Sequence, residues 1–225
     1  ELGEVVPTQK DLLVDKCNIK EKPDFKMRGM GRGVWALRNK ANVFLPWKDV
    51  GFVNKWGVSH SFKRIIPLEK YGKSHPEFFA LVDGKRNLKR RGYSYPQLCT
   101  SNPELIAEVV ENIRAELDKN PKIRMIGLSP NDGLGFCECE NCSALDEDAP
   151  LSDALISTWP SARGKNLSRR MLIFYRAVAD EIAKSHPDVI INSYAYFINT
   201  EPPLDSNIKG GPNQTIQLCH GACQN

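Results

Sequence analysis

Apolar side chains recur every three or four residues in two segments of the chain, and this spacing predicts two amphipathic helices. The first helix is expected over about 103–119, with Leu105, Val109, Ile113 and Leu117 on its apolar face. The second is expected over about 167–185, with Met171, Tyr175, Val178 and Ile182 on its apolar face. Ser101, three residues before Glu104, predicts a capping box at the start of the first helix.

Each predicted helix is followed by a turn marked by proline and then by a short apolar run. These runs are 123–128 (IRMIGL) and 189–197 (VIINSYAYF). Because they are rich in β-branched and aromatic residues and lie between amphipathic helices, they are typical of buried parallel strands. A further strand over 95–99 is expected to lead into the first helix. The alternation of strand and helix over about 95–197 predicts an α/β fold.

Weaker strand candidates lie upstream at 25–30 and 52–58, and downstream at 215–219. Together these segments give five or six strands, whereas a complete (β/α)8 barrel usually needs about 250 residues. The sequence therefore predicts an α/β fold of the (β/α)8 TIM-barrel type that is incomplete at its C-terminus. Residues 1–22 are expected to form an N-terminal lead-in, and residues 23–225 a partial barrel of the catalytic type.

Composition excludes several classes of protein. The chain has 225 residues, of which 41% are hydrophobic and 26% charged, so it is neither a disordered tail nor a membrane protein. No run approaches the roughly 20 apolar residues that span a bilayer. The net charge of +4 is spread thinly and concentrates only at 85–91 (KRNLKRR), which is typical of a solvated loop. Nucleic acid is therefore not an expected partner.

Three of the seven cysteines, Cys137, Cys139 and Cys142, stand within six residues. Thiolates spaced this closely can surround one tetrahedral Zn²⁺ ion, and Cys99 is the best candidate for a fourth ligand. Cys99 ends the strand expected at 95–99, beside the strand that leads to the cluster. A structural zinc site is one interpretation, and free thiols or one disulfide with spare thiols is the other. Cys219 and Cys223, which flank His220, form a weaker second set.

Asn131 and Asp132 follow the strand expected at 123–128, and they precede Gly133. The carboxyl ends of strands carry the active site in α/β barrels, so these two residues can place an amide and a carboxylic acid beside a substrate. The alternative is that Asn-Asp-Gly forms a simple turn, since all three residues favour tight backbone geometry.

Two more residues, one after a strand candidate and one within a strand candidate, are candidates for substrate binding. His60 follows the segment 52–58, and Arg28 lies in the segment 25–30, where its guanidinium can bind sugar hydroxyls or a carboxylate. The alternatives are an ordinary loop histidine and an internal salt bridge. His75, in Ser-His-Pro-Glu, is better explained as a loop residue.

Four segments in order carry a resemblance to a known family. They are 75–86 (HPEFFALVDGKR), 97–103 (QLCTSNP), 128–133 (LSPNDG) and 136–142 (FCECENC). Together they resemble the bacterial domain of unknown function 4838, over about 23–197. That family is associated with glycoside hydrolase family 163, whose known activity is endo-β-N-acetylglucosaminidase action on N-glycans. The segment 23–29 (PDFKMRG) is similar to the first strand of family 20 hexosaminidases, whose arginine binds sugar hydroxyls, and this implies the same role for Arg28.

The resemblance implies a glycoside hydrolase for glycans that contain N-acetylglucosamine, with the substrate acetamido group as internal nucleophile and no cofactor for catalysis. Asp132 would be the acid and Asn131 would orient the acetamido group. Tyr194 and Tyr196, at the end of the strand 189–197, would form an aromatic wall. Glu138 and Glu140 are rival acids that their place between cysteines disfavours.

Other functions fit parts of the sequence. A glycosidase for uronic acids would pair Arg28 with the substrate carboxylate. A non-catalytic glycan-binding or metal-stabilised domain would bind sugar without hydrolysis, and a zinc ribbon for nucleic acid would need two Cys-x-x-Cys pairs. The expected partner is a glycan or glycoprotein. The family implies export from a bacterial cell, although residues 1–8 lack the basic and apolar stretches of a signal peptide.

Overall fold

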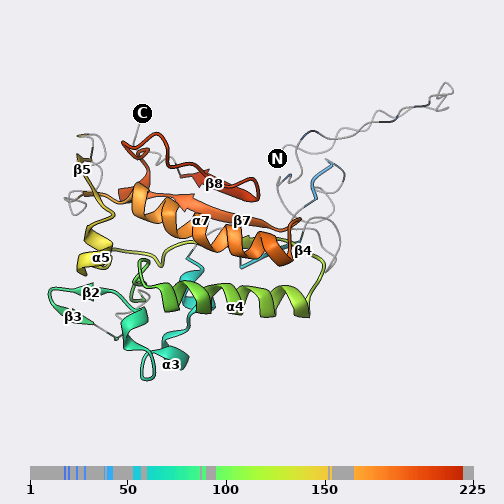
Figure 1. Cartoon of the computed structure of the whole chain (residues 1–225). Helices are drawn as coiled ribbons and strands as arrows, with labels where there is room; N and C mark the ends of the chain where they lie inside the picture. The colour runs from blue at the N-terminus through green and yellow to red at the C-terminus, as the bar shows by residue number, and fades with distance from the viewer. Residues whose placement is uncertain are drawn as a thin grey trace, which may run out of the picture.

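A four-stranded parallel sheet is the centre of the fold in a computed structural model of the chain (Figure 1). The structure describes residues 53–56, 60–86, 88–89, 95–151 and 165–219, with single positions at 18, 20, 24, 28, 38, 40–42 and 153. The strands are β1 (Val53–Lys55), β4 (Ile123–Gly127), β7 (Ile190–Ala195) and β8 (Gln214–Leu218). They lie side by side in the order β1-β4-β7-β8, which is also their order along the chain. The fold is therefore α/β with a parallel sheet.

Two long helices pack together on one face of this sheet. Helix α4 (Pro103–Lys119) lies between β1 and β4 in the chain, and α7 (Ser168–Ser185) lies between β4 and β7. Crossovers between parallel strands are almost always right-handed, so helices that join strands in sequential order cover the same face. Figure 1 shows α4 and α7 along this one side, and their apolar stripes share a core with Ile123, Ile126 and Ile191.

Shorter elements surround the sheet and helices. They are α2 (Phe62–Ile65), α3 (Leu68–Tyr71), η1 (Pro76–Phe78), β2 (Leu81–Val82), β3 (Lys85–Arg86), α5 (Glu140–Ser143), β5 (Glu147–Pro150), β6 (Lys165–Asn166) and η3 (Phe197–Asn199). Strands β2 and β3 form a hairpin through Asp83 and Gly84, which both have positive φ. Positive φ at both central residues is the geometry that suits a two-residue hairpin turn.

Most of the predicted elements are confirmed. The two helices begin and end within one residue of the expected bounds, and the predicted apolar stripes are buried. The segments 123–128, 189–197 and 52–58 contain β4, β7 and β1, and the segment 215–219 overlaps β8, which begins one residue earlier. The lead-in 1–22 and the strand candidate 25–30 lie outside the described residues apart from isolated positions, and so do His220 and Cys223.

The strand expected at 95–99 is wrong. This segment makes one isolated antiparallel bridge, between Leu98 and Phe79, and joins no sheet strand. Pro96 has no backbone N–H to give to a ladder. The edge of β4 that this strand would have occupied is taken by β1, whose Lys55 lies opposite Ile126.

None of the helices within the described part of the chain combines the length and the apolarity that a membrane crossing requires.

The residue that caps α4 is Asn102, which corrects the capping box expected at Ser101. The Asn102 side-chain oxygen accepts hydrogen bonds from the backbone N–H groups of Glu104, at 2.9 Å, and Leu105, at 3.2 Å. The Ser101 hydroxyl lies instead 3.0 Å from the sulfur of Cys142. Pro103 then occupies the first helical position, where a missing N–H costs nothing.

Replacing Asn102 with Ala should lower the free energy of unfolding by about 1 kcal/mol, because two N–H groups at the start of α4 lose their acceptor. Urea unfolding followed by circular dichroism measures this change. Asn102→Asp is the matched control, since a carboxylate at the same position also caps a helix. An alanine variant as stable as the aspartate variant would contradict the role given to Asn102.

Candidate active site and cysteine cluster

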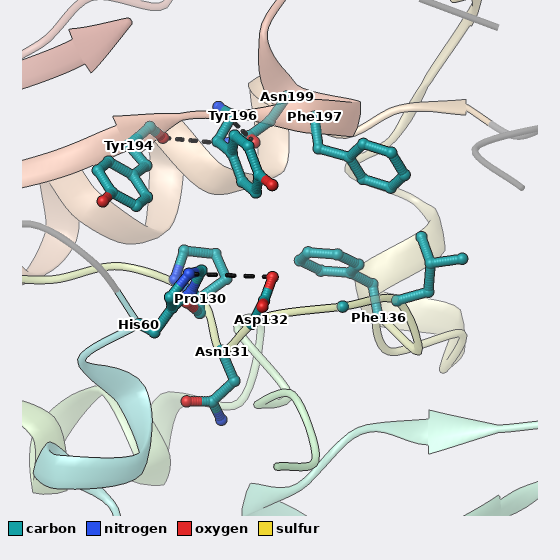
Figure 2. A pocket seen from close by; sticks show the side chains of 11 residues that line it. His60, Pro130, Asn131, Asp132, Phe136, Tyr194, Tyr196, Phe197 and Asn199 are labelled. Carbon is teal, nitrogen blue, oxygen red and sulfur yellow. Dashed lines mark hydrogen bonds and ion pairs between the residues drawn. The ribbon is translucent and has the colours of Figure 1, made fainter. Parts of the chain in front are cut away.

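A hollow opens at the carboxyl ends of the three neighbouring strands β1, β4 and β7 (Figure 2). Its volume is about 180 Å³. Pockets for drug-sized ligands usually measure about 300–1,000 Å³, so this hollow has room for one ring-sized group. The residues that line it are His60 after β1, 130–134 and Phe136 after β4, and Tyr194, Tyr196, Phe197 and Asn199 at the end of β7.

His60 and Asp132 face each other across the mouth of the hollow (Figure 2). The Nε2 atom of His60 lies 3.9 Å from the Oδ1 atom of Asp132. Its other nitrogen, Nδ1, lies 3.1 Å from the backbone oxygen of Pro130. Because a carbonyl oxygen only accepts hydrogen bonds, Nδ1 carries the proton that is donated to Pro130. Nε2 is therefore the atom of the ring that is available to the carboxyl group of Asp132.

The side chain of Asp132 is accessible to solvent, although the preceding residue, Asn131, is buried. Its side chain is 70% exposed, against 29% for His60. Figure 2 shows the carboxyl group directed toward His60 and the tyrosines, on the open side of the loop. A group in this position can reach a ligand that enters the hollow from solvent.

Tyr194 and Tyr196 form the opposite wall. Their ring centroids lie 6.0 Å apart, and the His60 ring approaches them edge-on at 6.0 Å and 6.4 Å respectively. Burial raises the pKa of Tyr196, and the negative charge of Asp132 acts in the same direction. A raised pKa favours the neutral phenol, so Tyr196 stays a hydrogen-bond donor at neutral and mildly alkaline pH.

Asn131 points away from the hollow and braces its floor (Figure 2). Its side-chain oxygen accepts a hydrogen bond from the backbone N–H of Lys63, at 2.9 Å, and its side-chain nitrogen donates to the backbone oxygen of Pro96, at 2.8 Å. The buried side chain of Gln97 completes the brace. It accepts from the Asn131 backbone N–H at 3.0 Å and donates to the backbone oxygens of Asn131 and Gly133.

A second set of bonds holds the loop after β1 against the loop after β4. The backbone oxygen of Ser129 accepts from the N–H groups of Ser61 and Phe62, both at 3.1 Å. The Ser129 N–H donates to the Ser61 hydroxyl oxygen at 2.8 Å. These bonds fix the positions of the two loops that carry His60 and Asp132.

Two of the residues that line the hollow have unusual backbone angles. His60 has φ of 52° and Phe197 has φ of 60°, in the left-handed region that residues with a Cβ seldom adopt. Such strain costs about 1–3 kcal/mol per residue and gathers at functional sites, where the surrounding structure enforces it. The strain lies on both sides of this hollow.

Three other predicted site residues lie elsewhere. Arg28 is not among the residues that line the hollow, and its guanidinium donates to the backbone oxygen of Lys40 at 2.8 Å. The carboxylate of Glu138 accepts from the Asp83 backbone N–H at 2.8 Å. Glu140 is exposed in the first turn of α5, and neither glutamate lines the hollow.

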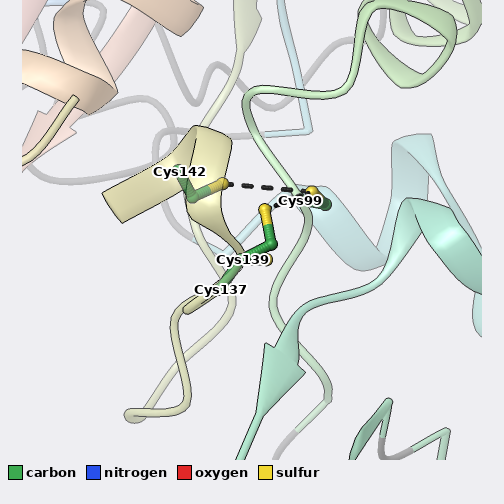
Figure 3. A group of neighbouring side chains, drawn as sticks. All are labelled: Cys99, Cys137, Cys139 and Cys142. Carbon is green, nitrogen blue, oxygen red and sulfur yellow. Dashed lines mark hydrogen bonds between the residues drawn. The ribbon is translucent and has the colours of Figure 1, made fainter. Parts of the chain in front are cut away.

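The four cysteines predicted as metal ligands come together in one group (Figure 3). The sulfur atoms of Cys99, Cys137, Cys139 and Cys142 all lie within 4.8 Å of one another. All four are free thiols, and three of them are buried while Cys139 is partly exposed. Cys99 reaches the group from the irregular segment before α4 and not from the end of a strand. The arrangement is compatible with a metal site.

The thiols in this group affect one another strongly. Hydrogen bonds from Cys137 and Cys99 lower the pKa of Cys142 far below its ordinary value, and the Ser101 hydroxyl and the charge of Arg170 act in the same direction. The pKa of Cys99 is raised far above its ordinary value, mainly by its hydrogen bonds with Cys137 and Cys142. The four thiols are therefore electrostatically coupled as one group.

Comparison with protein families gives one decisive result. The family model for the domain of unknown function DUF4838 matches residues 1–225. The chain belongs to the DUF4838 family. Neither the curated proteins nor the solved structures gave a match.

Several residues of this DUF4838 hollow were missed by sequence reasoning. Phe136, Phe197 and Asn199 line it, and the side chain of Asn199 holds the turn after β7 by donating to the backbone oxygen of Tyr194 and accepting from the N–H of Tyr196. Their position just beyond strands was the available signal, because loops at these ends form the sites of parallel α/β proteins.

Replacement by Ala should affect stability much more at Asn131 than at the adjacent Asp132. Asn131→Ala should lower the free energy of unfolding by about 2 kcal/mol, because the Lys63 N–H and the Pro96 carbonyl lose their partner. Asp132→Ala should change it by less than about 0.5 kcal/mol, since its side chain is largely in water. Urea denaturation of the two variants tests this. Equal destabilisation by the two variants would contradict the structural role given to the Asn131 side chain.

Proposed function

We propose that this DUF4838 chain carries the sugar site of a glycoside hydrolase that acts on glycans containing N-acetylglucosamine. One observation carries the proposal: a solvent-accessible carboxyl group, Asp132, faces His60 and a tyrosine wall in a ring-sized hollow at the ends of parallel strands. The resemblance of the sequence motifs to glycoside hydrolase family 163 is consistent with the same reaction class.

The lining of the hollow suits a sugar ring. Pyranose rings present apolar C–H faces and polar hydroxyl edges, and a tyrosine offers an apolar ring with a polar tip. Tyr194 and Tyr196 supply such rings on one side, and Phe136 and Phe197 extend the apolar surface. His60 and Asp132 supply the polar groups on the other side. A bound sugar would have its apolar face against the aromatic wall and its linkage oxygen toward the carboxyl group.

The proposed reaction uses Asp132 as the general acid. Its carboxyl proton passes to the glycosidic oxygen as the bond from that oxygen to the anomeric carbon breaks. The acetamido oxygen of the same sugar forms a bond to the anomeric carbon, and this bond closes a five-membered ring. Water then opens this ring and returns a proton to Asp132, so atoms and charge balance over the cycle. No cofactor takes part.

The acetamido group needs a donor to orient it, and we assign this contact to the Tyr196 hydroxyl. Asn131 was the residue expected from the sequence, but both ends of its side-chain amide are held by Lys63 and Pro96 below the loop. Asn131 is then a positioning residue for Asp132. The uronic-acid alternative would place a carboxylate against Arg28, which does not line the hollow.

The order of the sheet supports a barrel-type scaffold for this reaction. Four parallel strands in chain order, with both long helices on one face, are the arrangement of successive units in a (β/α)8 barrel. In such a barrel the active site lies at the carboxyl ends of the strands, and His60, Asp132 and Tyr196 stand at those ends here. We expect the protein to be exported, as its proposed glycan substrate requires.

Replacing Asp132 with Asn in the full-length protein should reduce glycan release from a glycoprotein by at least about 100-fold, because the amide cannot donate the required proton. Mass spectrometry of the released glycans measures the rate. Glu138→Gln and Glu140→Gln are matched controls, since each removes one of the rival acids outside the hollow. Turnover retained in Asp132→Asn but lost in either control would transfer the acid role to that glutamate.

A panel of aryl glycosides tests the substrate class separately. We expect turnover of the N-acetylglucosaminide and none of the glucuronide, since the Tyr196 hydroxyl would hold an amide and Arg28 lies outside the hollow. Saturable binding of N-acetylglucosamine with no hydrolysis of any substrate would favour a glycan-binding domain.

A further inference from the structure

We propose that Cys99, Cys137, Cys139 and Cys142 bind one zinc ion in a closed tetrahedral site whose role is structural. The site lies outside the hollow, and the inference does not depend on the proposed reaction.

The spacing of the sulfur atoms is that of a tetrahedron around one ion. Zinc–sulfur bonds measure about 2.3 Å, so the edges of a tetrahedral ZnS₄ unit are about 3.8 Å. The Cys99 sulfur lies 3.6 Å from that of Cys139 and 3.9 Å from that of Cys142. No pair of sulfur atoms in the group is more than 4.8 Å apart. A disulfide would need about 2.05 Å, so the sulfurs stand where ligands of one ion would stand.

The donors limit which ion can bind. Four thiolates form a soft, fully sulfur-based site, which selects zinc or iron and disfavours calcium and magnesium. With four protein ligands there is no open position for water or substrate, and closed sites of this kind are structural. On binding, each thiol releases its proton to solvent and forms one Zn–S bond, and no oxidant or reductant is needed.

The surroundings of the cluster also suit metal-bound thiolates. The backbone N–H of Leu81 donates to the Cys137 sulfur at 3.3 Å, and the Ser101 hydroxyl lies 3.0 Å from the Cys142 sulfur. Outer groups of this kind orient ligands and offset their negative charge. Arg170 is 2% exposed, and it donates to the Cys137 backbone oxygen at 2.6 Å while Asp146 lies 3.1 Å from its Nε atom. Arg170 therefore fixes the ligand loop to helix α7.

The ion would join two parts of the chain that have little regular structure of their own. Cys99 comes three residues before the cap of α4, and the other three ligands follow the loop that forms the hollow. Between β4 and the four-residue helix α5, residues 128–139 contain no helix or strand. One ion would cross-link the start of α4 to this loop and hold it without a regular backbone ladder.

Elemental analysis of the full-length protein, purified without added metal, is the direct test. We expect about one zinc per chain and no stoichiometric iron. Cys139→Ser should lose most of this zinc, and Cys139 is chosen because it is the least buried ligand. Cys219→Ser is the matched control, since Cys219 lies at the end of β8 outside the cluster, and it should keep the full amount.

A second measurement covers the case in which Cys139→Ser does not fold. Cobalt(II) exchanged into the wild-type protein should give the intense visible absorption of a tetrahedral thiolate site. Stepwise modification of the thiols should release zinc to a colorimetric chelator, and this needs no variant.

Three results would overturn the proposal. They are a wild-type protein without stoichiometric metal, stoichiometric iron in place of zinc, and a disulfide among the four cysteines in the non-reduced protein. Loss of zinc from Cys219→Ser together with retention in Cys139→Ser would also refute the ligand set.

Discussion

Hydrogen bonding of β4 between two parallel neighbours is the constraint on which the rest of the structure depends. Ile126 lies opposite Lys55 of β1 and Ile191 of β7, so the three strands run level and end at the same edge. Parallel strands cannot be joined by tight turns, and the return connections are the helices that cover one face. The loops that leave the carboxyl ends of these strands must then meet at that shared edge, and the hollow with His60 and Asp132 lies where they meet.

Much of the fold was predictable because its signals are local. Apolar side chains that recur every three or four residues indicate an amphipathic helix. Short apolar runs between such helices are buried most readily as strands of a sheet. The predictions were wrong where a local signal was ambiguous, at the cap of α4 and at the segment 95–99. Ser101 and Asn102 are both good caps, and the outcome depends on the attraction of the Ser101 hydroxyl to a distant cysteine. At 95–99 a short apolar run resembled a strand, but β1 holds the edge of β4.

The sequence predicted several of the residues that form the site but not where their side chains point. Residues after strands could be named from the sequence, and so could Cys99 as the fourth member of the cysteine group. The orientation of Asn131 and Asp132 could not, since it depends on partners 34 and more positions away, such as Gln97 and Lys63. The aromatic surface from Phe136 and Phe197 likewise arises only when three separate loops converge.

The agreement between chain order and spatial order in the sheet has an evolutionary consequence. Each loop at the rim belongs to one strand and its following helix, so it can lengthen or shorten without changing the pairing of any other strand. Ligand preference can therefore diverge among relatives while the framework stays constant. The bonds between Ser61 and Ser129 mark the exception, because they couple two adjacent loops and oblige them to change together.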